Sequence, residues 1–210
     1  MIVDCIGCLH GARPHLEGGD LLIVTGDLCA RDEYDEYVAF FEWLKKQKYR
    51  KKIFISGNHD NNAMSQFDWG NKSTDYLLDS GTVFQGLKIW GSPWTNKFDG
   101  INPKCCAFTV EKDDELMEKW NLIPRNIDIL VTHGPPFTIL DKTTEGFQVG
   151  SPTLMASHIL TLRPKLWVFS HIHEAYGVEG PYDWSGTKYV NCSIMNERYQ
   201  PVNKPVRIVL

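Results

Sequence analysis

Short apolar runs that end abruptly in polar turns recur five times along the chain. The runs are nearly continuously apolar and rich in β-branched residues, a pattern typical of strands buried on both faces of a sheet. Each run is followed directly by a turn that contains Gly, Asn, Asp or His. The pattern therefore predicts a sheet with polar loops at its strand ends. The five predicted strands are Met1–Ile6, Leu21–Thr25, Ile53–Ser56, Ile127–Thr132 and Leu166–Ser170.

Helical patterns lie between these runs and favour a layered α/β fold. Residues Asp32–Lys48 place apolar side chains at helical spacing, with Asp32 as the expected N-cap and lysines near the C-terminal end. A second helix is expected to begin at Ser151-Pro152 and to end before Pro164. Two helices among buried strands predict that helices cover the sheet.

Further strand-like runs predict a second sheet. Thr82–Trp90, interrupted by Gly86, has the pattern of a hairpin, and both Gly186–Ser193 and Val206–Leu210 are expected to add strands to it. A chain of 210 residues is long enough to bury one sizeable core, and nothing in it requires two. We therefore expect a single domain spanning residues 1–210.

Composition and charge exclude several classes of partner. The net charge is −4 and no long Lys/Arg tract occurs, so the chain has no electrostatic footprint for nucleic acid or for an anionic membrane. The sequence contains neither a secretory signal nor a run of about 18 apolar residues, and a cytoplasmic protein is expected. Most of its six cysteines are expected to be free thiols in or near the core. No feature of the sequence indicates an oligomeric state.

Five of the seven histidines follow predicted strands directly. In open α/β sheets, ligands bind at the carboxyl ends of the strands, so these loops are expected to converge on one crevice. A single histidine after a strand is more often structural, but five together with Asp27 and Asn58 favour a site for transition metals. Asp27 is the natural bridge between two cations about 3.5–4 Å apart. The five histidines are His10, His59, His133, His171 and His173.

These residues form an ordered set of motifs along the chain. In order they are His10, Gly26-Asp27, Gly57-Asn58-His59-Asp60, His133 and Ser170-His171-Ile172-His173. The set resembles the calcineurin-like metallophosphoesterase pattern D-x-H, G-D, G-N-H-[DE], H and G-H-x-H. Other stretches resemble the metallophosphoesterase-domain-containing subgroup, which is similar to class III cyclic-nucleotide phosphodiesterases. Those stretches are Thr132–Pro136, Gly91–Trp94 and Asn191–Ser193.

The resemblance implies a fold and a metal centre. The implied fold is a four-layer α-β-β-α sandwich of two mixed sheets flanked by helices. The implied cofactors are two divalent metal ions, with Mn²⁺ as the first choice and Fe or Zn²⁺ as alternatives. The first ion would be held by the first-motif residues Cys8 and His10 together with Asp27 and His173. The second would be held by Asp27, Asn58, His133 and His171.

The resemblance also implies a reaction. A metal-bound hydroxide would attack a phosphodiester or phosphomonoester of a small substrate, with a nucleotide as the expected class. His59 would act as general acid or charge stabiliser, oriented by Asp60, and Asn58 would lie near a phosphoryl oxygen. The expected activity is therefore that of a metal-dependent phosphoesterase.

The first motif departs from the family pattern, because Cys8 stands where the pattern has Asp. Three interpretations are open. Cys8 is a thiolate ligand that favours thiophilic ions, or the first site is weak or empty, or Asp4 reaches the site instead. The second interpretation leads to a competing hypothesis, a degenerate member that binds nucleotide or metal with little turnover.

Two further observations leave roles unassigned. Ser170 replaces the glycine that usually precedes His171, which is a mild change because serine is also small. Several loop residues lie where they could line a pocket, but aromatic side chains more often pack in cores or at rims. These residues are Trp94, Phe98, Asp99 and Phe137.

Overall fold

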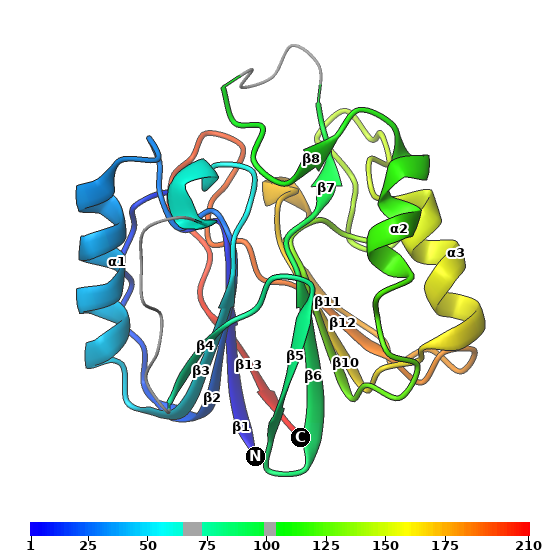
Figure 1. Cartoon of the computed structure of the whole chain (residues 1–210), viewed down its shortest axis with the longest axis horizontal. Helices are drawn as coiled ribbons and strands as arrows, with labels where there is room; N and C mark the ends of the chain where they lie inside the picture. The colour runs from blue at the N-terminus through cyan, green and yellow to red at the C-terminus, as the bar shows by residue number, and fades with distance from the viewer. Residues whose placement is uncertain (65–72, 99–103) are drawn as a thin grey trace.

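A five-stranded mixed sheet forms one half of the computed structural model, which describes residues 1–64, 73–98 and 104–210 (Figure 1). Its strand order is β13-β1-β2-β3-β4, and every neighbouring pair is parallel except β13 and β1. The bounds are β1 (Ile2–Ile6), β2 (Gly19–Thr25), β3 (Tyr49–Ile55), β4 (Thr74–Tyr76) and β13 (Val206–Val209).

A six-stranded mixed sheet packs against the first, in the order β11-β12-β10-β9-β6-β5. Its four inner strands are parallel, and the edge strands β5 and β11 are antiparallel to their neighbours. A short pair, β7 (Thr95–Asn96) with β8 (Thr109–Val110), lies apart from both large sheets. The bounds of the six strands are β5 (Ser80–Phe84), β6 (Leu87–Ser92), β9 (Ile129–Thr132), β10 (Leu166–Phe169), β11 (Gly177–Glu179) and β12 (Lys188–Asn191).

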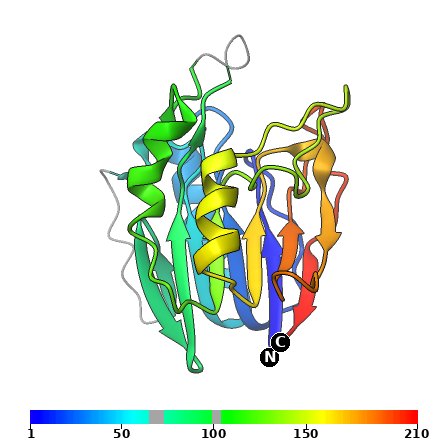
Figure 2. The same cartoon turned by 90° about the vertical axis from the view of Figure 1, so that its right-hand side faces the viewer.

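Helices cover the outer face of each large sheet. Helix α1 (Tyr34–Lys46) lies on the first sheet, while α2 (Met117–Trp120) and α3 (Pro152–Thr161) lie on the second, as Figure 2 shows from that side. The predicted four-layer α-β-β-α sandwich is therefore confirmed. Three single turns of 3₁₀ helix complete the described elements: η1 (Asn61–Met64), η2 (Asp113–Leu116) and η3 (His173–Ala175). No helix among the described residues is long and apolar enough to cross a membrane.

Alternating side chains of the strands bury apolar surface on both faces, as the continuous apolar runs predict. In β2, Ile23 faces the second sheet and contributes to the core between the sheets, whereas Leu22 and Val24 pack under α1. The matching side chains of α1 are Phe40 and Leu44. Because strand residues are covered on both sides, the sheets form a rigid frame for the loops at their ends.

Strand β13 corrects the expectation that Val206–Leu210 belongs to the second sheet. It pairs antiparallel with β1 in the first sheet. The reason lies in one buried carboxylate of β1: Asp4 accepts bonds of 2.8 Å from both Nε and Nη2 of Arg207 in β13, and a bond from the Tyr49 hydroxyl. A buried carboxylate requires such partners, and β13 supplies the cation. Asp4 is thereby engaged in the middle of β1 with partners outside the donor sets, so the interpretation that it reaches the metal site is wrong.

The start of α1 also differs from the prediction. The helix begins at Tyr34 with Glu33 as its N-cap, and the side chain of Glu36 accepts a bond from the Glu33 N–H at 3.2 Å. Asp32 instead adopts a left-handed conformation (φ 62°) and accepts a bond from the Asn62 N–H at 2.9 Å. A carboxylate that serves η1 in this way cannot also cap α1.

The predicted hairpin is confirmed, since β5 and β6 are joined by a turn at Gln85-Gly86 and lie in the second sheet. Strand β12 lies in the same sheet, as expected. All six cysteines are free, and four of them are buried, while Cys105 is half-buried and Cys106 is exposed.

The two large sheets are joined at one end. Gly7, just after β1, donates to the Cys192 carbonyl at 2.9 Å and accepts from the Ile194 N–H at 3.0 Å. Beside it, the Thr25 hydroxyl donates to the Ser170 hydroxyl at 2.8 Å, which links the loop ends of β2 and β10. A side chain at Gly7 would not fit, because its Cβ would lie 1.9 Å from Thr25 Oγ1. Hydrogen bonds therefore join the two sheets directly beneath the loops described next.

Candidate metal centre

The five loops that follow buried strands meet at the end of the sandwich drawn uppermost in Figure 1. The first sheet contributes residues after β1, β2 and β3, and the second sheet contributes residues after β9 and β10. Parallel strands end at the same edge, so loops distant in sequence become neighbours. The structure brings together Cys8, His10, Asp27, Asn58, His59, His133, His171 and His173.

The backbone at this edge is strained. Four of the assembled residues, none of them glycine, have positive φ: 49° at Cys8, 41° at His10, 51° at Asp27 and 69° at His171. Side chains other than glycine rarely adopt this region, and each instance costs on the order of 1–3 kcal/mol. Strain of this kind persists where the surrounding fold over-determines it, and it concentrates at functional sites.

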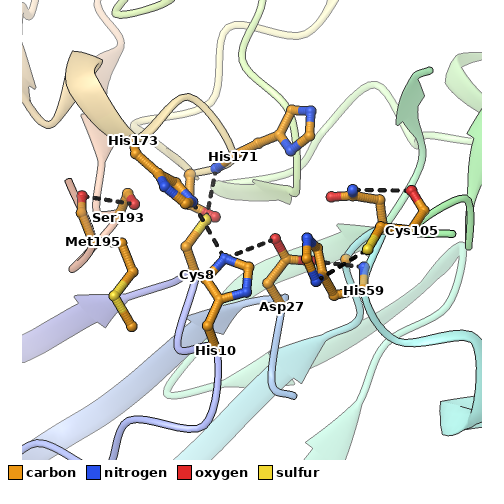
Figure 3. A network of polar contacts seen from close by, with 12 residues as sticks. Cys8, His10, Asp27, His59, Cys105, His171, His173, Ser193 and Met195 are labelled. Carbon is orange, nitrogen blue, oxygen red and sulfur yellow. Dashed lines mark hydrogen bonds and ion pairs between the residues drawn. The ribbon is translucent and has the colours of Figure 1, made fainter. Parts of the chain in front are cut away.

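The first donor set consists of Cys8, His10, Asp27 and His173, whose ligand atoms all lie within 4.8 Å of one another. The Nε2 atom of His10 lies 3.5 Å from Asp27 Oδ2 and 3.3 Å from His173 Nε2 (Figure 3). Burial lowers the pKa of His10 to about 3, so its ring is neutral. Donation from His173 Nδ1 to the Asn196 carbonyl at 3.1 Å leaves the Nε2 lone pair of that ring for the set.

The second donor set consists of Asp27, His133 and His171, with the Asn58 amide beside them. His133 Nδ1 donates to the Thr25 carbonyl at 2.7 Å, so Nε2 is the atom available as a ligand. That Nε2 lies 3.0 Å from Asn58 Oδ1 and 3.5 Å from Asp27 Oδ2. Three acceptors thus face one another, an arrangement that a cation between them stabilises.

Neighbouring groups fix the orientation of the Asn58 side chain. Its Nδ2 donates to the Cys105 carbonyl at 3.1 Å, and its backbone carbonyl accepts from the Ala107 N–H at 3.2 Å. The amide oxygen is therefore the atom that faces His133. Sequence reasoning does not find this support, because residues 104–108 belong to no motif.

Asp27 is common to both sets and carries their charge. Burial disfavours its charged form, but His133, His10 and His59 together hold the pKa of Asp27 well below its usual value. Burial alone would lower the pKa of His133, but the neighbouring Asp27 carboxylate outweighs this effect and raises the pKa of that ring to about 9. The carboxylate is ionised and its neighbourhood attracts a positive charge, either a proton or a metal ion.

One ring nitrogen provides a direct test of the fit to a metal. Within the described part of the chain, His171 Nε2 is buried and has no hydrogen-bond partner. Buried polar atoms are almost always paired, so this orphan needs an explanation such as a bound ion. Imidazole, carboxylate, amide oxygen and thiol are also the ligand types that divalent transition metals take. The residues of the site therefore fit the implied metal ions.

Asp60 has a different position from the one expected. Its carboxylate accepts bonds from the backbone N–H groups of Gly57 at 2.8 Å, Leu28 at 3.0 Å and Cys29 at 3.2 Å. The expectation that Asp60 orients the His59 ring is corrected, because the carboxylate points to the turn after β2, where these amides need an acceptor. Burial raises the pKa of Asp60 to about 8 although the backbone donors oppose this rise. Asp60 thus supports the loop that carries Asp27.

His59 lies over the first donor set. Its backbone N–H donates to Asp27 Oδ1 at 3.0 Å, and its ring packs edge-on against the His10 ring with centroids 4.5 Å apart. His59 Nδ1 lies 3.5 Å from the Ala30 carbonyl oxygen and 3.4 Å from Cys105 Sγ. Figure 3 shows His59 and Cys105 together beside Asp27. The ring is thus placed at the edge of the metal centre rather than within a donor set.

A cavity of about 460 Å³ opens in front of both donor sets. Two aromatic residues that the sequence leaves without a role lie against histidines of the two donor sets. The Phe98 ring stacks on His171 at 5.2 Å, and the Tyr199 ring lies 4.8 Å from His10. The lining includes Asp27, Asn58, His59, Lys97, Phe98, Cys105, Phe147, His171, His173 and Tyr199.

Sequence signals for these aromatic residues are weak. Phe98 and Tyr199 lie in loops with no motif, and only the folded structure brings them to the cavity. Trp94, an equally plausible candidate, instead donates to Asp79 at 2.8 Å and stacks under the Lys119 ammonium. Asp99 lies outside the described residues.

Comparisons with known proteins agree with this geometry. Residues 3–175 match the family model described as Calcineurin-like phosphoesterase. The chain is 36% identical over 235 residues to Metallophosphoesterase domain-containing protein 1 of Homo sapiens, an alignment that covers 98% of this chain and 70% of that protein. A UPF0046 protein of Caenorhabditis elegans is 32% identical over 237 residues, with coverages of 96% and 58%. A solved crystal structure superposes with a TM-score of 0.60 at 13% identity, covering 90% of this chain and 89% of the other, which shows the shared fold alone.

Proposed function

The chain belongs to the calcineurin-like phosphoesterase family, and from this premise we propose that it hydrolyses phosphoester bonds of a small nucleotide at a two-metal centre. The observation that carries the proposal is the sharing of Asp27 between two donor sets at the mouth of one cavity. A carboxylate with two oxygens bridges two cations, as two-metal hydrolytic centres require.

The chain's own residues divide the work. One divalent ion would be held by Asp27, Asn58, His133 and His171, and the other by Asp27, Cys8, His10 and His173. When bound, two divalent ions supply charge that neutralises the phosphoryl group and lowers the pKa of a coordinated water. The mixed oxygen and nitrogen donors of the second set support Mn²⁺ or Fe there.

His59 is proposed as the catalytic residue that meets the leaving oxygen. It lines the cavity beside Asp27, and one of its ring nitrogens is turned to the Ala30 carbonyl. The other nitrogen would donate a proton or stabilise developing charge on the departing group. Asn58 would lie near a phosphoryl oxygen, and Asp60 would act on both through the Asp27 loop.

The shape and lining of the cavity support a small substrate. A volume of about 460 Å³ suits a molecule of nucleotide size, and Phe98, Phe147 and Tyr199 offer aromatic surface to a base. The Lys97 ammonium, which is paired with Glu111 at 2.5 Å, also lies in the lining. The net charge of −4 disfavours long nucleic acids.

The test is hydrolysis of bis(p-nitrophenyl) phosphate and p-nitrophenyl phosphate by the Mn²⁺-loaded protein, with Asp27→Asn as the inactive reference. We expect the natural protein to exceed Asp27→Asn by roughly 10³-fold on at least one substrate. Asp20→Asn, which alters an exposed carboxylate far from the site, should keep full activity. A natural protein no faster than Asp27→Asn on either substrate would contradict the proposal.

A second candidate function has one observation in its favour. Cys8 is buried and its sulfur accepts a hydrogen bond from the His171 N–H at 3.1 Å, so a thiol rather than a carboxylate stands in the first set. Without the usual carboxylate, the chain would bind a nucleotide with little turnover. Calorimetric binding of a nucleoside monophosphate, combined with absence of hydrolysis, would identify this function.

A further inference from the structure

Cys8 is the residue by which this chain departs from the motif it otherwise follows. It stands in the first donor set with His10, Asp27 and His173, and all four ligand atoms lie within 4.8 Å of one another. The same number of protein donors, of the same three types, occurs in zinc sites. What the sulfur does therefore decides which ion the first site takes.

The fold holds the Cys8 side chain in place from several directions. Its backbone N–H donates to the Gly26 carbonyl at 3.0 Å, which ties it to the turn that carries Asp27. Its sulfur accepts from the His171 N–H at 3.1 Å, as Figure 3 shows. Hydrogen bonds from backbone amides to sulfur stabilise metal-bound thiolates and tune them. The sulfur thus lies as an acceptor beside His10 and His173, the two histidines of the first donor set.

No other described carboxylate replaces the missing aspartate. Asp4 is engaged with Arg207 and Tyr49, and Asp60 accepts bonds from the turn after β2. Because Asp27 also belongs to the second donor set, a Cys8 thiolate would supply the one negative charge that belongs to the first set alone.

Sulfur changes the selectivity of the set. Thiolate is a soft ligand that favours Zn²⁺ and other thiophilic ions, whereas carboxylate and amide oxygens suit Mn²⁺ and Mg²⁺. We propose that Cys8, His10, Asp27 and His173 form a thiolate site that takes Zn²⁺ in preference to Mn²⁺, while the second set keeps oxygen and nitrogen donors only. This inference rests on the proposed metal centre but not on turnover.

X-ray absorption at the zinc edge tests the natural protein without any substitution. We expect a sulfur neighbour at about 2.3 Å from zinc, beside nitrogen and oxygen neighbours at about 2.0–2.2 Å. The spectrum is recorded with one and with two equivalents of zinc, because the second set contains no sulfur. Spectra without a sulfur neighbour at both loadings would overturn the proposal.

Cobalt replacement assigns the sulfur to a residue. Co²⁺ bound by a thiolate shows a sulfur-to-metal charge-transfer absorption, which we expect in the natural protein and expect to be lost in Cys8→Ser. Cys105→Ser is the matched control, because Cys105 Sγ lies 3.4 Å from His59 Nδ1 and outside both donor sets. An absorption that survives in Cys8→Ser but disappears in Cys105→Ser would contradict the assignment.

Metal competition measures the consequence. In a mixture of Zn²⁺ and Mn²⁺, Cys8→Asp should shift the preference of the first site toward Mn²⁺ by at least about tenfold, because oxygen replaces sulfur. Metal content per chain is measured by mass spectrometry, and circular dichroism checks that the variant is folded. An unchanged preference in folded Cys8→Asp would overturn the inference. Zinc binding through Cys8 without phosphoester hydrolysis would leave the inference standing and contradict the proposed function alone.

Discussion

Two buried carboxylates of the first sheet, Asp4 and Asp27, have opposite surroundings. Asp4 receives both Nε and Nη2 of Arg207 and the hydroxyl of Tyr49, so its charge is matched by the fold itself. Asp27 receives one backbone N–H and faces the ring nitrogens of His10 and His133 at 3.5 Å. The difference separates a structural charge, which is complete within the protein, from a functional one, which needs a cation from outside.

The backbone follows the same division. Asp4 lies in the middle of a regular strand, whereas Asp27 and three other residues around it have positive φ. Regular backbone occurs where hydrogen bonds are complete. Strained backbone persists where other interactions, such as ligand binding, offset its free-energy cost. Four substitutions examine this contrast, from the largest expected effect to the smallest.

Gly57→Ala should displace the Asp27 carboxylate without removing any charged group. A Cβ at Gly57 would lie 2.3 Å from Asp27 Oδ1 and 2.5 Å from His133 Cε1, so the carboxylate shared by the two donor sets must move. We expect a loss of activity of roughly 10³-fold, about 4 kcal/mol, measured as kcat/KM together with bound metal per chain. Gly86→Ala is the control: its Cβ meets nothing within 4 Å, and at φ +81° it should cost about 1 kcal/mol of stability with activity unchanged. Equal activities of the two variants would contradict the prediction.

Arg207→Met should destabilise the folded protein at Asp4. It leaves a buried carboxylate with the Tyr49 hydroxyl as a partner but without its cation, and we expect the free energy of unfolding to fall by about 3 kcal/mol. Activity per folded molecule should not change, because none of Asp4, Tyr49 and Arg207 belongs to either donor set. Arg50→Met, which removes an exposed pair with Asp20 at 3.4 Å, should cost less than about 0.5 kcal/mol in the same denaturant titration. A loss of metal binding in folded Arg207→Met would break the contrast.

Asp60→Asn should weaken metal binding at Asp27 indirectly, through the loop that carries it. An amide group keeps one carbonyl acceptor but loses the second, so the N–H groups of Gly57, Leu28 and Cys29 are no longer all paired. We expect metal affinity and activity to fall by about 10- to 100-fold, as for residues that orient metal ligands. Metal titration with a fluorescent chelator measures the first effect, and direct catalysis by Asp60 would instead lower kcat with the metal affinity unchanged.

Asp128→Asn removes a carboxylate that lies neither in the Asp4 cluster nor in the donor sets around Asp27. The Lys88 N–H and then Lys165 hold the pKa of Asp128 below its usual value, so the charged form stabilises the folded protein. The contribution is under about 1 kcal/mol because Asp128 is only partly buried and its partner Lys165 is exposed. It is present above a pH of about 3.9 and is lost as the pH falls through the lowered pKa, so the two proteins should converge in stability in acid. A constant difference from neutral to acidic pH would show that the effect is not one of titration.

Much of the fold follows from the sequence because its strongest signals are local. Continuous apolar runs predict strands covered on both faces, and histidines placed directly after them predict which loops meet. The partner of β13 does not follow, since four alternating residues fit either sheet and the deciding contact, Arg207 with Asp4, spans the whole chain. Asp32 resembles a helix cap because its short carboxylate side chain can accept a bond from a nearby backbone N–H. The same property lets it accept the Asn62 N–H instead.

The candidate site follows from the sequence only as far as its motifs extend. The motif order brings out the histidines and Asp27, but a motif does not state where a side chain points, and Asp60 faces the turn after β2 rather than His59. Phe98 carries only the weak signal of an aromatic residue in a loop, and Tyr199 carries none, because both reach the cavity through loops whose course depends on the finished fold. Orientation and lining are properties of packing, not of spacing.

The joint between the sheets at Gly7 has a consequence for motion. Its amide bonds to Cys192 and its carbonyl to Ile194, so separating the sheets at the site end requires breaking backbone hydrogen bonds within a buried region. Loops from the two sheets therefore cannot drift apart through small fluctuations. The amide hydrogens of Gly7 and Ile194 should exchange with solvent deuterium only when the whole domain unfolds, which makes the distance between the two halves of the site as durable as the fold.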